Sequence, residues 1–125
     1  MFMTFLHVAI GGAIGASLRY GAGLWVARMA LPGLPWGVIS VNIIGSFLMG
    51  AFAVWSLARG QGALNPFVMT GVLGGFTTFS AFSLEAVTLI ERGDMAAALL
   101  YIALSVGLSI GALGLGFWVM RGMLA

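Results

Sequence analysis

The side chains in this sequence that could do chemistry are mostly uncharged hydrogen-bonding groups set within apolar segments. Three hydroxyls, those of Tyr101, Ser105 and Ser109, recur every four residues, which places them on one face of a helix. Asn42 and Ser46 share the same spacing in an earlier segment. Such rows either join neighbouring helices or line a path for a polar ion. The spacing alone leaves both interpretations open.

A second group lies between these rows in the chain. Phe79 and Phe82 are three residues apart and share a helical face, and Glu85 follows on the same face as the only carboxylate within an apolar segment. Aromatic residues at this spacing usually pack in a core, whereas an intramembrane carboxylate is a functional candidate. Arg19 also lies deep in its segment, where it either has a partner, lines a wet vestibule or extends to the interface.

Residues 71–82 interrupt one apolar segment with glycines and hydroxyls. We expect the helix to unwind there, because Gly74 and Gly75 tolerate dihedral angles that other residues avoid. Unwound backbone at membrane depth must be buried in protein, bind an ion or line a polar cavity. Transporters and channels build ion sites in this way, so we place the functional site at this interruption.

The composition indicates an integral membrane protein. Of the 125 residues, 62% are hydrophobic and 6% are charged, which excludes a typical water-soluble domain. The five basic residues are scattered, which argues against a nucleic-acid partner, and the absence of cysteine excludes a thiolate metal site. No catalytic constellation is evident, so we predict that the protein is not an enzyme.

Four apolar segments are long enough to cross a bilayer, which takes about 20 residues. We predict a single all-α membrane domain over residues 1–125, with a broken third helix. The predicted spans are residues 3–29, 36–57, 65–91 and 95–120. Asn65 and Pro66 are expected to cap and begin the third span. Small residues in the first span, and Gly107, Gly111 and Gly114 in the fourth, are expected to form helix-packing faces.

The arginines do not favour one orientation in the membrane. Arg59 and Arg121 fall on one side and Arg28 and Arg92 on the other, with Arg19 counted as intramembrane. The chain is therefore expected to insert both ways. Two inverted copies would then form an antiparallel, dual-topology homodimer, with the two interruptions meeting near the midplane.

Three stretches, residues 11–20, 41–47 and 74–85, together resemble the Fluc (CrcB) family of fluoride ion channels. The third stretch, Gly-Gly-Phe-Thr-Thr-Phe-Ser-Ala-Phe-Ser-Leu-Glu, carries most of the resemblance. Tyr101, Ser105 and Ser109 match the family in the fourth span. Ala81 departs from the family pattern, which has threonine at that position.

The resemblance implies a role for each candidate residue. The backbone carbonyls of Gly74 and Thr77 would hold a structural sodium ion that is not transported. The fluoride pore would be lined by Asn42, Phe79, Phe82, Ser80, Tyr101, Ser105, Ser109 and Glu85. Arg19 would have a vestibule or structural role.

The implied function is passive export of cytoplasmic fluoride through a multi-pass protein of a prokaryotic inner membrane, in contact with the lipid bilayer. Two other functions are compatible with four small helices. A proton-coupled exporter of the small multidrug-resistance type needs an acidic residue in its first helix, and this chain has none before Glu85. A non-conducting assembly protein would explain the glycine stripes but not the interrupted third span.

Overall fold

The computed structural model describes all of residues 1–125, and every regular element in it is a helix. Four helical stretches are long and apolar enough to cross a membrane: Phe2–Arg28, Trp36–Ala58, Gly62–Glu91 and Met95–Leu124. The predicted all-α fold with four membrane helices is confirmed. The chain is a multi-pass membrane protein.

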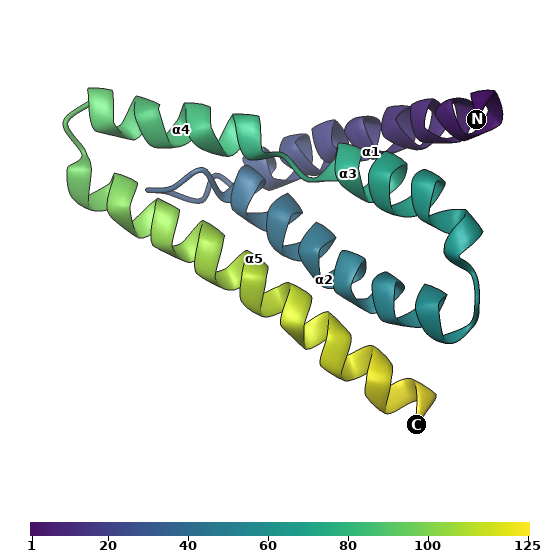
Figure 1. Cartoon of the computed structure of the whole chain (residues 1–125). Coiled ribbons are helices and arrows are strands. Elements are labelled where there is room, and N and C mark those ends of the chain that lie inside the picture. The colour runs from purple at the N-terminus through teal and green to yellow at the C-terminus, as the bar shows by residue number, and fades with distance from the viewer.

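Three of the four stretches are continuous helices: α1 (Phe2–Arg28), α2 (Trp36–Ala58) and α5 (Met95–Leu124). The third stretch is divided into η1 (Gly62–Leu64, a 3₁₀ turn), η2 (Pro66–Leu73, a π-helix), α3 (Gly74–Phe76) and α4 (Phe79–Glu91). Figure 1 shows a non-helical connection between α3 and α4 midway along this stretch.

The start of the third stretch differs from the expectation for Asn65. Pro66 does occupy the first helical turn, but Asn65 has helical dihedral angles and its side chain makes no capping hydrogen bond. Its Oδ1 is buried without a partner. The predicted Asn65 cap is therefore wrong. The reason is that η1 leads directly into η2, so Asn65 continues a helical path instead of starting one.

Helix α1 packs against η2 through small residues, as predicted for the first span. A Cβ added at Gly15 would collide with the backbone oxygen of Val72, and one added at Gly11 would lie 3.0 Å from the Cα of Gly71. The glycines therefore let the two backbones touch, which is the usual way in which membrane helices gain packing energy.

Helices α2 and α5 form a second close pair. A Cβ at Gly50 would collide with the Leu113 oxygen, and one at Gly116 would collide with the Phe47 oxygen. No helix of the same chain packs on the predicted glycine face of α5, because added Cβ atoms at three of its glycines meet nothing within 4 Å. Helix α5 instead turns its buried hydroxyl face and Gly116 inward. The three open glycines are Gly107, Gly111 and Gly114.

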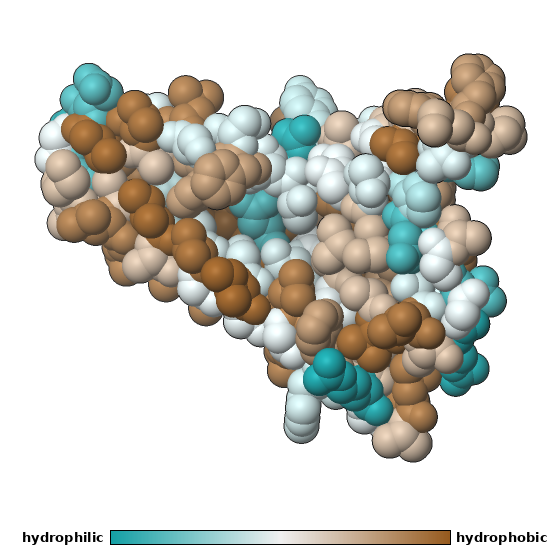
Figure 2. Space-filling model, in the orientation of Figure 1, coloured by the Kyte–Doolittle hydropathy of each residue, from teal (hydrophilic) through white to brown (hydrophobic).

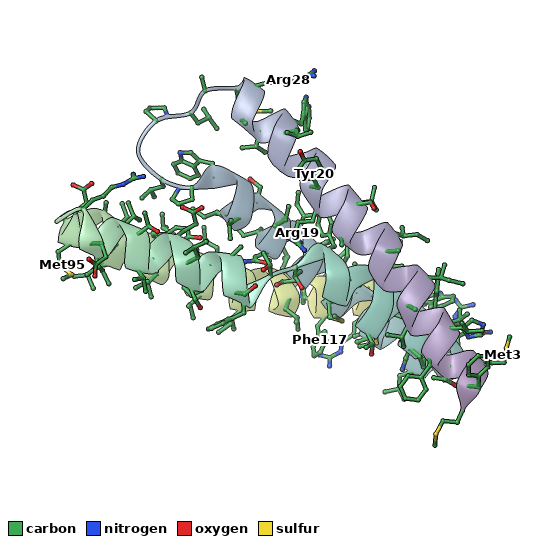
Figure 3. The ribbon with its side chains drawn as sticks, turned by 90° about the horizontal axis from the view of Figure 1, so that it is seen from above. Met3, Arg19, Tyr20, Arg28, Met95 and Phe117 are labelled. Atoms are coloured by element: carbon green, nitrogen blue, oxygen red, sulfur yellow. The ribbon has the colours of Figure 1, made fainter.

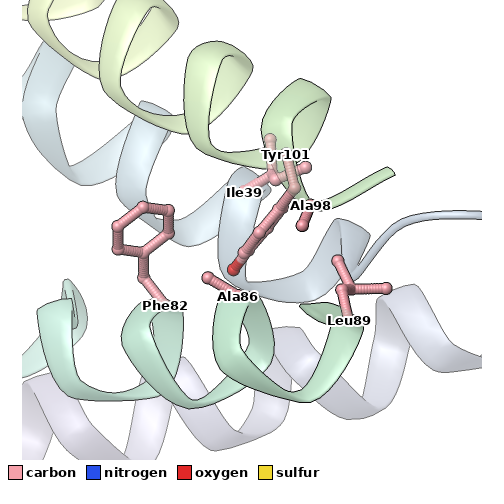
Figure 4. Packing of buried hydrophobic residues seen from close by; sticks show 6 residues of the cluster. All are labelled: Ile39, Phe82, Ala86, Leu89, Ala98 and Tyr101. Carbon is pink, nitrogen blue, oxygen red and sulfur yellow. The ribbon is translucent and has the colours of Figure 1, made fainter. Parts of the chain in front are cut away.

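A small apolar core forms where α2, α4 and α5 meet. It contains Ile39, Phe82, Ala86, Leu89, Ala98 and Tyr101. In Figure 4 the Tyr101 side chain extends from α5 between its neighbours, and its hydroxyl end lies beside Ala86 of α4. This cluster holds α4, the segment after the interruption, against the rest of the chain.

Most of the protein surface is apolar. Only 16 of the 125 residues are buried, and large hydrophobic side chains are exposed along every long helix. Figure 2 shows apolar side chains over much of one face, with a more polar area near its centre. A surface of this kind requires lipid or another protein subunit as its neighbour.

Candidate functional site

The helical path of the third stretch stops at two threonines. Thr77 (φ −87°, ψ 161°) and Thr78 (φ −153°, ψ 124°) are extended between α3 and α4. Thr78 then caps α4, because its Oγ1 accepts a hydrogen bond of 3.1 Å from the Ala81 amide. The expected unwinding at Gly74 and Gly75 is wrong in its position, since both glycines are helical. Gly75 serves close packing instead: an added Cβ would lie 2.8 Å from the Gly12 oxygen.

Asn42 holds the extended backbone from the neighbouring helix. Its Nδ2 donates to the Thr78 oxygen at 3.0 Å, and its Oδ1 accepts from the Thr78 amide at 2.8 Å. These two bonds replace the strand or helix partners that an extended residue lacks inside a membrane. They also fix which side of the amide carries the nitrogen, and they leave one N–H of Nδ2 free.

The extended residues take amide donors away from several carbonyls, including those of Gly74 and Thr77. In a continuous helix, Gly74 O would accept from the Thr78 amide, but that amide donates to Asn42. Thr77 O would accept from the Ala81 amide, but that amide donates to the Thr78 hydroxyl. None of the backbone hydrogen bonds outside the helices ends on either oxygen. Both oxygens are hard ligands of the kind that small cations prefer.

Arg19 occupies a third carbonyl at the same place. Its Nε donates to the Gly75 oxygen at 3.0 Å, and Figure 3 shows its side chain directed from α1 toward the junction of α3 and α4. Arg19 also lines a cavity of about 280 Å³ that includes Tyr20 and Thr78. The structure thus gives this intramembrane arginine a specific partner.

A second cavity, of about 340 Å³, lies between α2, the extended threonines, α4 and α5. It brings together five of the predicted pore residues: Asn42, Phe79, Phe82, Ser105 and Ser109. Ser46, Thr77 and Thr78 add further polar groups to its lining, and Met49, Val106 and Ile110 complete it. Its walls therefore combine hydrogen-bonding groups with aromatic rings and contain no charged side chain.

The two phenylalanines have different surroundings. Their ring centroids are 5.4 Å apart in an edge-to-face arrangement. Phe79 is 76% exposed, whereas Phe82 is 8% exposed and lies 5.3 Å from the Tyr101 ring. Phe82 therefore belongs both to the cavity wall and to the core, and Phe79 has one face without a partner in the chain.

The predicted row of hydroxyls on α5 is buried and unpaired. Tyr101 is fully buried and Ser105 is 4% exposed. The oxygens of Tyr101, Ser105 and Ser109 all lack a hydrogen-bond partner in the structure. Leaving a buried hydroxyl unpaired costs about 1 to 3 kcal/mol, and Ser105 and Ser109 line the 340 Å³ cavity, where a polar guest could bond to them.

The remaining predicted residues lie outside the 340 Å³ cavity. Ser80 is exposed, and its Oγ lies 3.3 Å from the Thr78 hydroxyl. Glu85 lines a different cavity, with Thr88 and Arg92. Thr78 was not singled out from the sequence, although a threonine that precedes a helical segment is a favoured cap.

The comparisons with known proteins agree in their result. The family described as "CrcB-like protein, Camphor Resistance (CrcB)" matches residues 6–117. The chain is 63% identical over 125 residues to a "Fluoride-specific ion channel FluC" of Ruegeria sp. (strain TM1040), covering 99% of both chains. It is 59% identical over 122 residues to the protein of that name in Roseobacter denitrificans, covering 96% of this chain and 97% of the relative. It is 51% identical over 125 residues to the protein of that name in Cereibacter sphaeroides, covering both chains fully.

Proposed function

The chain belongs to the CrcB-like family, and on this premise we propose that it is a fluoride-selective ion channel that lets cytoplasmic fluoride leave the cell passively. Relatives that match it over nearly their whole length carry the name of a fluoride-specific channel. The observation that carries the proposal is the uncharged cavity lined by Asn42, Phe79, Phe82, Ser105 and Ser109. A passive channel catalyses no reaction, so no catalytic residue is assigned.

The chemistry of the cavity suits a small, strongly hydrated anion. Fluoride enters a pore where directed donors replace its water, and it leaves where it is held only weakly. The unpaired hydroxyls of Tyr101, Ser105 and Ser109 and the free N–H of Asn42 are such donors. The edges of the Phe79 and Phe82 rings carry partial positive charge and add weak contacts. Ser80 and Glu85 extend the proposed pore lining beyond the cavity.

We further propose that two chains assemble as an antiparallel homodimer in the inner membrane of a prokaryote, with lipid around its outer face. The arginines are balanced across the membrane, which supports insertion in both directions. Gly74 and Phe79, on either side of the extended threonines, are both exposed in the single chain. A second copy over this region would cover both.

The backbone at the interruption fits a structural sodium ion. The oxygens of Gly74 and Thr77 have lost their helical donors, and a sodium ion takes such carbonyls as ligands. Two inverted copies would supply four of them at one point on the two-fold axis. Replacing sodium with a bulky organic cation is expected to abolish fluoride flux. Full flux without sodium would refute this part of the proposal.

The decisive experiment is a flux measurement on purified protein in liposomes. With a fluoride gradient and an ionophore that dissipates the membrane potential, a fluoride electrode should record rapid efflux. An equal chloride gradient, followed with a chloride electrode, should give little or no protein-dependent efflux. Equal rates for both anions, or no fluoride efflux above that of empty liposomes, would refute the proposed function.

A further inference from the structure

A third cavity, of about 310 Å³, lies between α4 and the loop that joins α1 to α2. Leu34 and Pro35 form its loop side, and Glu85, Thr88 and Arg92 form its helical side. We call it the outer chamber. It is the only cavity described here that brings an acidic and a basic side chain together, and the residues proposed for the pore do not explain Arg92.

The outer chamber lies further along the face of α4 that carries Phe82. Glu85 is three residues beyond Phe82, and Thr88 and Arg92 follow at spacings of three and four residues, so these four side chains share one side of the helix. Phe82 lines the 340 Å³ cavity at the start of this row. An ion that passes Phe82 and Tyr101 along α4 would next meet Glu85 and then the outer chamber.

The charges in the outer chamber pose a problem for an anion. An ionised Glu85 repels fluoride, and the Thr88 hydroxyl donates its proton to the Leu84 oxygen at 2.7 Å, so it has no donor left. Arg92 is the only basic side chain in the lining. Its guanidinium carries a positive charge and five N–H donors.

We propose that the outer chamber is the mouth of the fluoride path and that Arg92 makes it passable, by offsetting the charge of Glu85 and concentrating fluoride from solution. This inference rests on the proposed channel function. Field lines from a charge in a cleft with low-dielectric walls are focused into the cleft, which raises the local concentration of the counter-ion. Arg92 is exposed at the end of α4, so solution fluoride reaches it directly.

The expected effect is moderate and depends on salt. A unit charge about 4 Å from an ion in a watery mouth changes its energy by about 1 kcal/mol, which corresponds to roughly a fivefold change in local fluoride concentration. At 0.5 M salt the screening length falls to about 4 Å, and most of this effect is lost. A purely structural role for Arg92 would not depend on ionic strength.

The test measures initial fluoride efflux from liposomes at about 20 mM and about 0.5 M ionic strength, with sodium held constant. We expect Arg92→Gln to lower efflux two- to fivefold at low salt. At high salt its efflux rate should approach that of the wild-type protein. Arg28→Gln is the matched control, because Arg28 is exposed at the same side of the chain but does not line the outer chamber. In a Glu85→Gln background, Arg92→Gln should lower efflux by a smaller factor, because the charge that repels fluoride is gone.

A second variant separates charge from folding. The chain has no cysteine, so Arg92→Cys can be modified after purification with a cationic or an anionic thiol reagent. The cationic adduct should restore low-salt efflux and the anionic adduct should lower it further. Equal efflux with both adducts, or equal losses in Arg92→Gln and Arg28→Gln, would overturn the inference. Absence of fluoride selectivity in wild-type protein would instead refute the proposed function itself.

Discussion

The double hydrogen bond between Asn42 and Thr78 leads to a prediction that separates two roles of one side chain. As a pore residue, Asn42 would only offer its free N–H to fluoride. The structure adds a second role, because Asn42 also pairs with both backbone groups of Thr78 and holds the extended segment in place. Replacing Asn42 with alanine removes both roles, and the two have different consequences.

The expected loss of stability in Asn42→Ala follows from its two hydrogen bonds to Thr78. One hydrogen bond contributes about 0.5 to 1.5 kcal/mol, and those measured in membrane proteins lie toward the lower value, so two contribute about 2 kcal/mol at most. That free energy corresponds to roughly a 30-fold shift in the equilibrium that favours the ordered segment. We therefore expect Asn42→Ala to unfold at a temperature roughly 5 to 10 °C below wild type. Asn42→Asp should lose at least as much stability, because it places a carboxylate oxygen against the Thr78 oxygen and an acid within the membrane.

The assay combines thermal unfolding of the purified protein with fluoride efflux at several sodium concentrations. Asn42→Ala should lose stability, and it should need more sodium for half-maximal efflux, because the Gly74 and Thr77 carbonyls are ordered by the same segment. Ser46→Ala is the control, since Ser46 lines the same cavity one helical turn away. We expect its stability to stay within about 0.5 kcal/mol of wild type. A variant Asn42→Ala with wild-type stability and sodium dependence, but no efflux, would refute the holding role.

Two further predictions concern the rings and the glycines. Phe79→Ile and Phe82→Ile should both lower fluoride efflux. Only Phe82→Ile should also lower thermal stability, by about 1 to 3 kcal/mol, because Phe82 is buried against Tyr101. Unchanged efflux in both variants would exclude the rings from the path. Gly15→Ala should destabilise the protein by about 1 to 3 kcal/mol, because the new Cβ collides with the Val72 oxygen. Gly12→Ala is the control and should unfold close to the wild-type temperature, because a Cβ there meets nothing within 4 Å. Equal stability of the two glycine variants would contradict the packing of α1 against η2.

Local sequence patterns were enough to predict the helical elements. Long apolar runs require internally hydrogen-bonded helices in a membrane, and the small residues around Gly11 and Gly15 correctly indicated close helix packing. The α5 glycines show the limit of such patterns. A glycine stripe marks a face that a neighbour can approach, but it does not say whether that neighbour is in the same chain.

The details of the candidate site depend on contacts that are distant in sequence. Asn42 and Thr78 are 36 residues apart, and Arg19 and Gly75 are 56 residues apart. Sequence spacing identified Asn42 as a polar residue on a helical face, but it could not show that a backbone segment elsewhere would use the amide. For the same reason, the sequence placed the expected unwinding at the glycines, whereas the residues that leave the helix are the threonines that Asn42 and the α4 cap hold.

Four consecutive carbonyls, those of residues 74–77, lose their helical donor at the interruption, and their partners affect how a cation site could form there. Arg19 holds the Gly75 oxygen, so this carbonyl is already satisfied by a fixed positive charge and is not available as a metal ligand. The Gly74 oxygen precedes it, and the Phe76 and Thr77 oxygens follow it; all three lack a helical donor. Arg19 thus removes one carbonyl from those that lost a helical donor at the interruption. Without Arg19, the Gly75 oxygen would also be free to bind a cation. In the proposed dimer, therefore, the first helix helps to determine which backbone atoms of the third stretch face the ion.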